Sequence, residues 1–445
     1  MNRFFSPSIL ALTLWLTNGA SLRSESFVFT TIAGLAGSSG GVDGTNSNAR
    51  FNRPSGVALD GAGNLYVSET LNHTIRRIAP AGTNWVVSTV AGLAGSLGSA
   101  DGTNGDARFN RPSGLALDAG GNLYVTDNYN HTIRQITPLG TNWVVSTIAG
   151  LAGVKGFEDG TNDLARFNDP QAIALDSSRH LYIADRLYNT IREISPEGTN
   201  WVTVTIAGLA SVYGGLVDGL NGNAEFSLPF GITRDGGGNL YVADFGNNAI
   251  RSIAPIGPDW STTTVTGFSG LVGTNDGPSS VAMFNAPNGI TIDSGGNLLV
   301  ADQSNNTIRK IAPDIGGWTV STIGGVPKLT GTNDGPGAVA MFNKPWGIAV
   351  NSAGTLFVAD SFNNTIRMGV PIVSTPPTLQ ILSAGGLIVI SWPSTATNYT
   401  LETSGTVNAV APWTPLTSGI SVSGTHCVLT NSPGAGTAFY RLHQH

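Results

Sequence analysis

Short runs in which apolar and polar residues alternate fill most of the chain and return in the same order. One unit reads GLALD, NLYVTD, HTIRQIT and WVVSTIAG between Gly114 and Gly150. A period of two, with β-branched or aromatic residues at alternate positions, is typical of β-strands. Turn-forming stretches such as DAGGN and PLGTNW separate the runs. The pattern therefore predicts four short strands in each unit.

These units repeat along the chain, and one phenylalanine marks each of them. Successive members are 58 or 59 residues apart. They are Phe51, Phe109, Phe167, Phe226, Phe284 and Phe342. Four-stranded units of this length, arranged radially, form a β-propeller with one blade per unit. We therefore predict an all-β fold with a six-bladed β-propeller made of four-stranded blades.

The two ends of the repeated region are offset by one strand. The segment FVFTTIAG at 27–34 has the pattern of a fourth strand, although it precedes the first unit. The segment NNTIRMGV at 363–370 has the pattern of a third strand, and no fourth strand of this type follows it. We expect the N-terminal strand to complete the last blade. The ring would then close without an unpaired edge in that blade.

The repeated pattern P-x-G-(V/L/I)-(A/T)-x-D-x-x-G-N-L-Y-V-A-D-x-x-N-(H/N)-T-I-R resembles the NHL repeat. The Asn-His pair of that family stands here as Asn72-His73 and Asn130-His131. The resemblance covers 27–370 and implies a six-bladed propeller. It does not imply one function, because propellers carry unrelated activities.

Several positions are shared by all or nearly all units, and we interpret them as scaffold. A glycine begins the first strand in five units, where the blades crowd the axis, and Ala172 replaces it in the third. An acidic residue ends every second strand, and an arginine follows seven residues later. We expect each acid to accept hydrogen bonds from turn amides or to pair with an arginine. His73 and His131 are interpreted as turn residues.

Other positions change from unit to unit, and they are the candidates for ligand binding. They directly follow the proline of the first strand or the acid of the second, so strand direction places them at one end of the ring. Exposed Trp, Tyr and Arg side chains are frequent interface anchors. Drift at unconstrained surface positions remains the alternative explanation. The candidate residues are Trp346, Phe230, Gln171, Asn288, Arg186, Tyr129, Phe245 and Phe362.

The segments outside the repeats suggest an exported protein with a second module. Residues 1–26 combine Arg3, an apolar run and small residues, which is the pattern of a secretory signal and leader. The predicted localisation is therefore secreted, periplasmic or cell-surface. Residues 371–378 read as a Pro-rich linker. Residues 379–445 alternate in short strands and are similar to small fibronectin-type-III-related β-sandwich modules.

Charge and cysteine content exclude several classes of partner. The formal net charge is −6, which argues against a nucleic-acid surface. No stretch after the signal is apolar enough to span a membrane. The single cysteine, Cys427, allows neither an internal disulfide nor a cysteine-based zinc site. We interpret it as a small core residue of the second module.

Candidate catalytic chemistry is sparse in this sequence. Some related propellers are lyases with metal-binding histidines along the channel, but we do not expect the six histidines here to converge on the axis, since three of them lie outside the repeats. The Asp-Gly pairs that begin at Asp43 and its counterparts could bind Ca²⁺, although a turn cap is the favoured interpretation. We expect no other cofactor. The predicted function is a non-catalytic scaffold that presents its variable face to a protein, glycan or small ligand. The alternative is a metal-assisted lyase or hydrolase acting at the mouth of the channel.

Overall fold

The chain divides into two compact units, one spanning Ser24–Ile372 and the other containing Val373–His445. The predicted signal and most of the predicted linker lie outside the residues that the structure, a computed structural model, describes. The described ranges are 26–211, 213–372, 379–384, 387–394, 399–404, 413–431 and 439–444.

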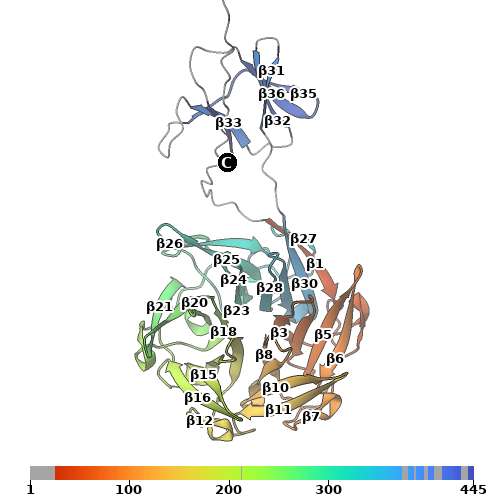
Figure 1. The fold of residues 1–445 in the computed structure, drawn as a ribbon, viewed down its shortest axis with the longest axis vertical. Coiled ribbons are helices and arrows are strands. Elements are labelled where there is room, and N and C mark those ends of the chain that lie inside the picture. The colour runs from red at the N-terminus through yellow and green to blue at the C-terminus, as the bar shows by residue number, and fades with distance from the viewer. Residues whose placement is uncertain are drawn as a thin grey trace, which may run out of the picture. The chain divides into compact units, whose positions relative to one another are not determined.

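The first unit consists of six antiparallel sheets of five strands each, arranged around a common centre (Figure 1). The innermost strand of every sheet begins with the proline of the repeat and is followed in the chain by the second strand. Innermost strands are β3 (Pro54–Leu59), β8 (Pro112–Leu117), β13 (Pro170–Leu175), β18 (Pro229–Arg234), β23 (Pro287–Ile292) and β28 (Pro345–Val350). Second strands are β4 (Leu65–Glu69), β9 (Leu123–Asp127), β14 (Leu181–Asp185), β19 (Leu240–Asp244), β24 (Leu298–Asp302) and β29 (Leu356–Asp360).

The third and fourth strands of each sheet are longer and lie farther from the centre. Third strands are β5 (Thr74–Ala81), β10 (Thr132–Leu139), β15 (Thr190–Glu197), β20 (Ala249–Ile256), β25 (Thr307–Asp314) and β30 (Thr365–Ile372). Fourth strands are β6 (Asn84–Ala91), β11 (Asn142–Ala149), β16 (Asn200–Ala207), β21 (Asp259–Gly267), β26 (Gly317–Gly324) and β1 (Ser26–Ala33). The prediction of an all-β chain built from repeated antiparallel units is confirmed.

The predicted number of strands per sheet is wrong by one. A two-residue strand from the long connection that precedes each unit pairs with the outer side of the fourth strand. These strands are β2 (Gly44–Thr45), β7 (Gly102–Thr103), β12 (Gly160–Thr161), β17 (Gly219–Leu220), β22 (Gly277–Pro278) and β27 (Gly335–Pro336). Two residues are too few to give a period-two pattern, so the sequence carries little signal for them.

Short 3₁₀ turns occupy the connections between strands. Four follow the two-residue outer strands: η1 (Asn46–Asn48), η2 (Asn104–Asp106), η4 (Asn162–Leu164) and η6 (Asn221–Asn223). Five follow the second strands: η3 (Asn128–Asn130), η5 (Arg186–Tyr188), η7 (Phe245–Asn247), η8 (Gln303–Asn305) and η9 (Ser361–Asn363). In the described part of the chain, no helix is long and apolar enough to span a bilayer.

The N-terminal strand pairs where the sequence predicts. β1 runs antiparallel to β30, with Val28 opposite Val370 and Thr31 opposite Arg367. β27 then pairs with the other side of β1. The last sheet is therefore built from the beginning and the end of the repeated region, and β1 supplies its fourth strand.

The innermost strands contact one another in the order β3, β8, β13, β18, β23 and β28, and β28 contacts β3. Glycines allow this approach. A Cβ added to Gly347 would lie 2.0 Å from the Ser55 carbonyl oxygen, and one added to Gly56 would lie 2.2 Å from the Ser113 carbonyl oxygen. Real Cβ atoms do not approach so closely, so the expectation that these glycines serve crowding at the axis is confirmed.

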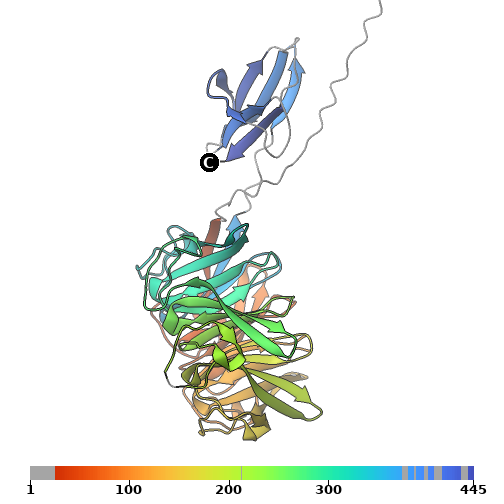
Figure 2. The ribbon, with the colours of Figure 1, turned by 90° about the vertical axis from the view of Figure 1, so that its left-hand side faces the viewer.

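Apolar clusters fill the space between neighbouring sheets and extend around the whole unit. One cluster joins Phe51 and Val67 of the first sheet to Phe357 and Ile366 of the last. Another joins Phe29 of β1 to the sheet that precedes it in the ring. Figure 2 shows the unit turned by 90°, so that the ring is seen from its edge. Packing between sheets, rather than within one sheet, therefore makes the core.

A buried arginine on each third strand connects three parts of its unit. Arg134 is fully buried, and its Nη1 lies 2.7 Å from Asp127, the acid that ends the second strand. Its Nη2 lies 2.7 Å from Asp101, and its guanidinium lies 5.1 Å from the Phe109 ring centroid. Asp127 also accepts the Asn110 backbone N–H at 2.7 Å. The other units repeat this arrangement, which confirms the scaffold interpretation of the acids.

The Asp-Gly acids are not turn caps, contrary to the favoured expectation. Asp43 accepts hydrogen bonds from the backbone N–H and the Oγ1 of Thr89, at 3.1 and 3.0 Å, as well as from Arg76. The 3₁₀ turns that follow have no side-chain cap. The acid therefore ties the long connection to the fourth strand. Its oxygens already contact donors, and Ca²⁺ binding there stays an untested prediction.

The described residues of the second unit form two antiparallel sheets. One has the order β31 (Gln380–Ala384), β32 (Leu387–Pro393), β36 (His426–Asn431) and β35 (Ile420–Ser423), and the other has β34 (Thr414–Pro415), β33 (Tyr399–Ser404) and β37 (Phe439–Gln444). Trp392, Leu401 and Leu429 form an apolar cluster that draws on both sheets. Cys427 lies in β36 and packs against this cluster, in agreement with its predicted role.

Gly347→Ala should destabilise the first unit by about 1–3 kcal/mol, because its new methyl group would overlap the Ser55 carbonyl. Gly61→Ala is the matched control, since nothing lies within 4 Å of a Cβ added there. Thermal unfolding of the two variants and the wild type measures the difference. Equal midpoints for Gly347→Ala and Gly61→Ala would contradict the close contact between the last and the first sheet.

Candidate functional site

The variable residues of the innermost strands lie in β-bulges. In the first sheet Pro54 pairs with Glu69, and the register shifts before Val57. The same shift occurs in every sheet, and it falls at the residue that follows the proline. A bulge bends the strand and redirects a side chain, and bulges are frequent next to binding sites. The scaffold therefore holds one side chain from each sheet at a fixed place near the centre.

The second variable set begins the turns that follow the second strands. Arg186 begins η5, Phe245 begins η7, and Tyr129 lies inside η3. Each second-strand acid lies opposite the proline of the neighbouring innermost strand, as Asp244 lies opposite Pro229. The two variable sets therefore occur at the same end of every sheet. This end is called the mouth below.

A pocket of about 230 Å³ lies at the mouth and brings most of the predicted residues together. Seven of the eight predicted residues line it. The lining consists of Thr70, Arg111, Ser113, Asn128, Tyr129, Asp169, Gln171, Arg186, Phe230, Phe245, Gln303, Lys344, Trp346 and Phe362. The eighth, Asn288, does not line it and is 1% exposed. Thus positions that vary between the repeated units meet in one pocket.

Aromatic rings form one side of the pocket. The ring centroids of Phe230 and Phe245 are 5.2 Å apart, and both residues belong to the fourth sheet. Trp346, from the sixth sheet, meets Phe230 edge-on at 5.3 Å. Phe230 is buried, whereas Phe245 and Trp346 are half-buried. The fourth and sixth sheets can meet here because Phe230 and Trp346 are the largest of the side chains that follow the prolines.

A chain of polar contacts forms another side. The Ser113 hydroxyl donates to Gln171 Oε1 at 3.1 Å, and Gln171 Nε2 donates to Asp169 Oδ1 at 3.1 Å. Arg186 Nη1 lies 2.6 Å from Asp169 Oδ2, and its guanidinium lies 5.4 Å from the Phe230 ring centroid. Arg186 therefore connects the polar side of the pocket to the aromatic side.

Sequence reasoning missed the residues directly before the prolines. Arg111, Asp169 and Lys344 occupy this position and line the pocket. Their φ angles are 57°, 68° and 49°, so each is in the left-handed region. Proline normally favours an extended conformation in the residue before it, so these left-handed angles depart from the usual preference. The available signal was that this position also varies between units: Arg53, Arg111, Asp169, Leu228, Ala286 and Lys344.

Neighbouring sheets hold these left-handed residues in place. The Lys344 backbone N–H donates to Asn306 Oδ1 at 2.8 Å, and Asn306 belongs to the preceding sheet. Around the ring the same role belongs to Asn189, Asn248 and Asn364, and to two histidines. Arg111 N–H donates to His73 Nδ1 at 3.1 Å, and Asp169 N–H donates to His131 Nδ1 at 3.3 Å. The histidines are turn residues, as predicted, and they position two pocket residues.

The buried acids next to the mouth have raised pKa values. Burial raises the pKa of Asp127 to about 6, even though Arg134 and amide donors favour the carboxylate. Asp185 of the third unit is raised further, to about 7. In five units an Asn side chain donates to the acid, as Asn130 does to Asp127 at 2.7 Å. Tyr188 replaces that Asn in the third unit, which removes one stabilising hydrogen bond from Asp185.

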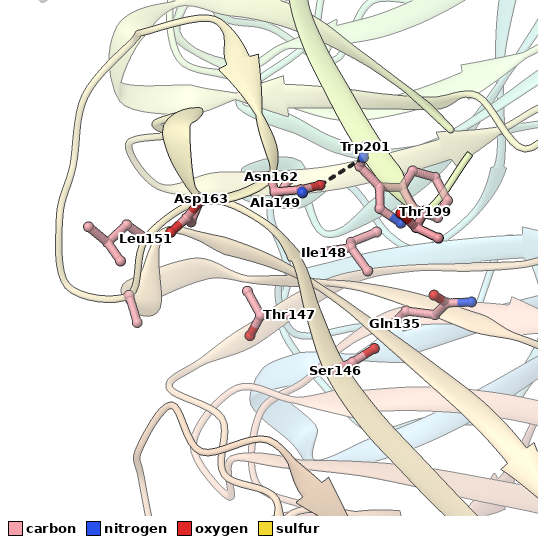
Figure 3. Close-up of a pocket in the computed structure, with 12 residues that line it drawn as sticks. Gln135, Ser146, Thr147, Ile148, Ala149, Leu151, Asn162, Asp163, Thr199 and Trp201 are labelled. Atoms are coloured by element: carbon pink, nitrogen blue, oxygen red, sulfur yellow. Dashed lines mark hydrogen bonds between the residues drawn. The ribbon is translucent and has the colours of Figure 1, made fainter. Parts of the chain in front are cut away.

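A larger groove, of about 620 Å³, lies between the second and third sheets (Figure 3). Ser146, Asn162 and Trp201 are among the residues that line it, and the Trp201 backbone N–H donates to Asn162 Oδ1 at 2.7 Å. The same bond recurs between Trp143 and Asn104. Most lining positions have the same residue in the neighbouring unit. We therefore attribute this groove to the repeat geometry and not to a specific site.

The acidic and histidine side chains of the described residues do not form a metal centre. Within the ranges that the structure describes, no three His, Cys, Asp or Glu side chains are grouped to hold a metal ion. The mouth pocket contains one carboxylate, Asp169, which is paired with Arg186. Its residues are therefore suited to hydrogen bonding, stacking and charge attraction.

Comparison with known sequences identifies the repeated units. A family described as the NHL repeat matches residues 51–78, 109–136, 284–311 and 342–367. The chain contains NHL repeats. The matched segments run from the marker phenylalanine through the innermost and second strands into the third strand. They include the acid and the buried arginine of each matched unit.

Curated proteins with similar repeats are longer than this chain. The chain is 30% identical over 345 residues to Protein SUPPRESSOR OF QUENCHING 1, chloroplastic, of Arabidopsis thaliana, an alignment that covers 71% of this chain and 30% of that protein. It is 31% identical over 303 residues to NHL repeat-containing protein 2 of Gallus gallus, covering 61% and 40%. The chain thus spans less than half the length of these two relatives.

Solved structures share the fold at low sequence identity. A structural genomics protein of unknown function from Bacteroides thetaiotaomicron has a TM-score of 0.59 and 22% identity, over 78% of this chain and 76% of that chain. An auxiliary nutrient binding protein from Bacteroides ovatus has a TM-score of 0.58 and 15% identity, over 78% and 77%. At these identities the likeness shows the fold alone.

Protonation of the two NHL histidines should weaken the first unit. Burial lowers the pKa of His73 and of His131 below the ordinary value of 6.5, and each Nδ1 must stay unprotonated to accept its N–H. The unfolded chain therefore binds protons before the folded chain does, and stability falls as the pH drops below 6.5. Asn fills the same left-handed position in the other units without titrating.

The double variant His73→Asn/His131→Asn should match the wild type in stability near pH 8 and exceed it increasingly between about pH 7 and about pH 5. Denaturant unfolding across this range measures the difference in the free energy of unfolding. Titration of the acids affects both proteins equally and therefore cancels in this difference. An equal loss of stability in the two proteins would show that the histidines do not contribute.

Proposed function

We propose that this protein is a non-catalytic binding scaffold, in which a six-bladed NHL propeller holds a ligand at its mouth. The supporting observation is the pocket of about 230 Å³, to which variable residues from several sheets contribute. The residues that repeat build the sheets and their packing, whereas the residues that differ line one hollow. A lining made of side chains from separate rigid strands is typical of preformed ligand sites.

The size of the pocket limits what it can enclose. Pockets for drug-sized ligands have volumes of about 300–1,000 Å³. The mouth pocket is smaller, so it suits a compact molecule or one protruding group of a larger glycan or protein. Two solved proteins with this fold are described as auxiliary nutrient binding proteins, so the fold serves binding elsewhere.

The rest of the molecule fits a carrier or surface protein. We propose that residues 1–26 are removed during export and that the mature protein is secreted, periplasmic or cell-surface. The second unit is proposed to be a fibronectin-type-III-like β-sandwich, which the apolar cluster shared by its two sheets supports. The alternative function, a metal-assisted lyase or hydrolase, has no grouped metal ligands among the described residues to favour it.

Trp346→Ala and Phe245→Ala should each weaken ligand binding at least about tenfold, because aromatic anchors of this kind contribute about 2 kcal/mol or more. The measurement is saturation-transfer NMR of a small-molecule library with the full chain, followed by calorimetry on the compounds that bind. Tyr213→Ala is the matched control, since Tyr213 is 85% exposed and does not line the pocket. Thermal unfolding confirms that all variants are folded. If both pocket variants bind the same compounds as the wild type does, the mouth is not the site.

A further inference from the structure

We propose that the mouth pocket recognises a small amphipathic anion, in which a carboxylate or a similar acidic group is attached to a flat apolar body. This inference rests on the proposed function and specifies its ligand class. It depends on the uneven distribution of charge and aromatic surface around the pocket.

The charge at the mouth is opposite to that of the chain. The lining contains three cationic side chains, Arg111, Arg186 and Lys344, and one carboxylate, Asp169, so three positive charges and one negative charge leave a surplus of two. The whole chain has a formal net charge of −6 and only 22 Lys and Arg residues. Local positive charge in an acidic protein attracts anions toward the site.

Asp169 neutralises one of these cations but not the others. Arg186 lies 2.6 Å from the Asp169 carboxylate and forms an ion pair with it, and Gln171 donates a hydrogen bond to the same carboxylate. Among the residues that the structure describes, neither Arg111 nor Lys344 forms an ion pair. Arg111 Nη1 donates to the Tyr129 hydroxyl at 2.7 Å, and Lys344 Nζ lies 4.9 Å from the Phe362 ring centroid. Their charges are therefore available to an acidic ligand group.

Arg111 and Lys344 occupy equivalent positions in their sheets, and the sheet between them has a third cation at the same position. Lys344, Arg53 and Arg111 each precede the proline of the innermost strand, in the sixth, first and second sheets. Those sheets contact one another in that order around the ring. The Arg53 guanidinium lies 3.1 Å from the Phe362 ring centroid. Arg53 does not line the pocket, but together with Lys344 and Arg111 it places cations on three adjacent sheets, which are called the cationic arc below.

The fourth sheet gives the pocket an aromatic side, and Gln303 of the fifth sheet and the Asp169–Arg186 pair of the third also line the pocket. The fourth and fifth sheets have Leu228 and Ala286 at the position where the arc has cations. Phe230 and Phe245 come from the fourth sheet, and Trp346 reaches Phe230 from the sixth. A flat apolar body can pack on these rings while its acidic group faces the arc. Thr70 of the first sheet and Ser113 of the second are short lining side chains, which leave room for the ligand.

A neutral sugar would use only part of this lining. Thr70, Asn128 and Gln303 offer hydroxyl and amide groups. The charges of Arg111 and Lys344, however, would face no acidic group. A cationic ligand would be repelled by the surplus positive charge. An anion carried on an apolar ring is the class that satisfies the free cations and the aromatic surface together.

Three probes of similar size test this inference by calorimetry on the full chain: phenylacetate, its isostere phenylacetamide, and 2-phenylethylamine. Phenylacetate should bind with a Kd of about millimolar or below, as expected for a small fragment. It should bind about tenfold or more tightly than the amide, because a hydrogen bond to a charged group is stronger than one between neutral groups. The amine should bind more weakly than the amide. Added salt should reduce the preference for the acid.

The variant Arg111→Gln/Lys344→Gln should bind phenylacetate and phenylacetamide with similar affinity, while its affinity for the amide stays near the wild-type value. Lys310→Gln, which removes a lysine of the third strand outside the pocket, should keep the preference for the acid. Trp346→Ala should weaken both probes by the same factor.

Equal binding of acid and amide to the wild type, or tighter binding of the amine, would overturn the anion inference and leave the proposed binding site in place. Absence of binding by all three probes would also overturn it. The library experiment with Trp346→Ala and Phe245→Ala would then decide the proposed function separately. A preference for the acid that persists in the double variant would place the anion elsewhere on the molecule.

Discussion

The backbone contact between neighbouring innermost strands is the constraint on which the rest of the first unit depends. A side chain at Gly347 or Gly56 would collide with a carbonyl oxygen of the neighbouring sheet, so these two positions require glycine. The contact fixes the distance of the sheets from the axis. The bulge that follows each proline fixes the position of the variable residue within it, such as Ser55 between Pro54 and Gly56. The pocket is thus a product of the same geometry that joins the sheets.

Buried ion pairs support this geometry from farther out. Each third-strand arginine, such as Arg134, contacts the acid of the second strand and the acid of the long connection. Removal of one partner would leave a buried charge without compensation, which is far more costly than loss of an exposed pair. The third unit departs from the pattern, because Tyr188 replaces an asparagine and the pKa of Asp185 rises to about 7. That unit also supplies Arg186 and Asp169 to the pocket.

Much of the fold could be predicted from the sequence because its signals are repeated. The period of two located the four main strands, and the offset between 27–34 and 363–370 located the pairing of β1 with β30. Two-residue strands carry no period, so the fifth strand was missed.

Comparison between units found seven pocket residues, but it overlooked Arg111 and Lys344. Proline usually favours an extended preceding residue. In the folded chain that residue is left-handed, and its N–H donates to Asn306 Oδ1 or to His73 Nδ1 of the preceding sheet, a long-range contact that the local sequence does not reveal. Asn288 was named because its position varies, yet its short side chain is buried beside the pocket rather than in it.

Equivalent backbone geometry in every unit has an evolutionary consequence. One unit of about 58 residues carries its own bulge residue, its own turn after the second strand and its own residue before the proline. Genetic exchange between two such segments would therefore replace all the lining side chains of one unit in a single event, between one and four residues, while keeping the arginine pairs. Ligand preference in this architecture can therefore diverge by shuffling of whole units.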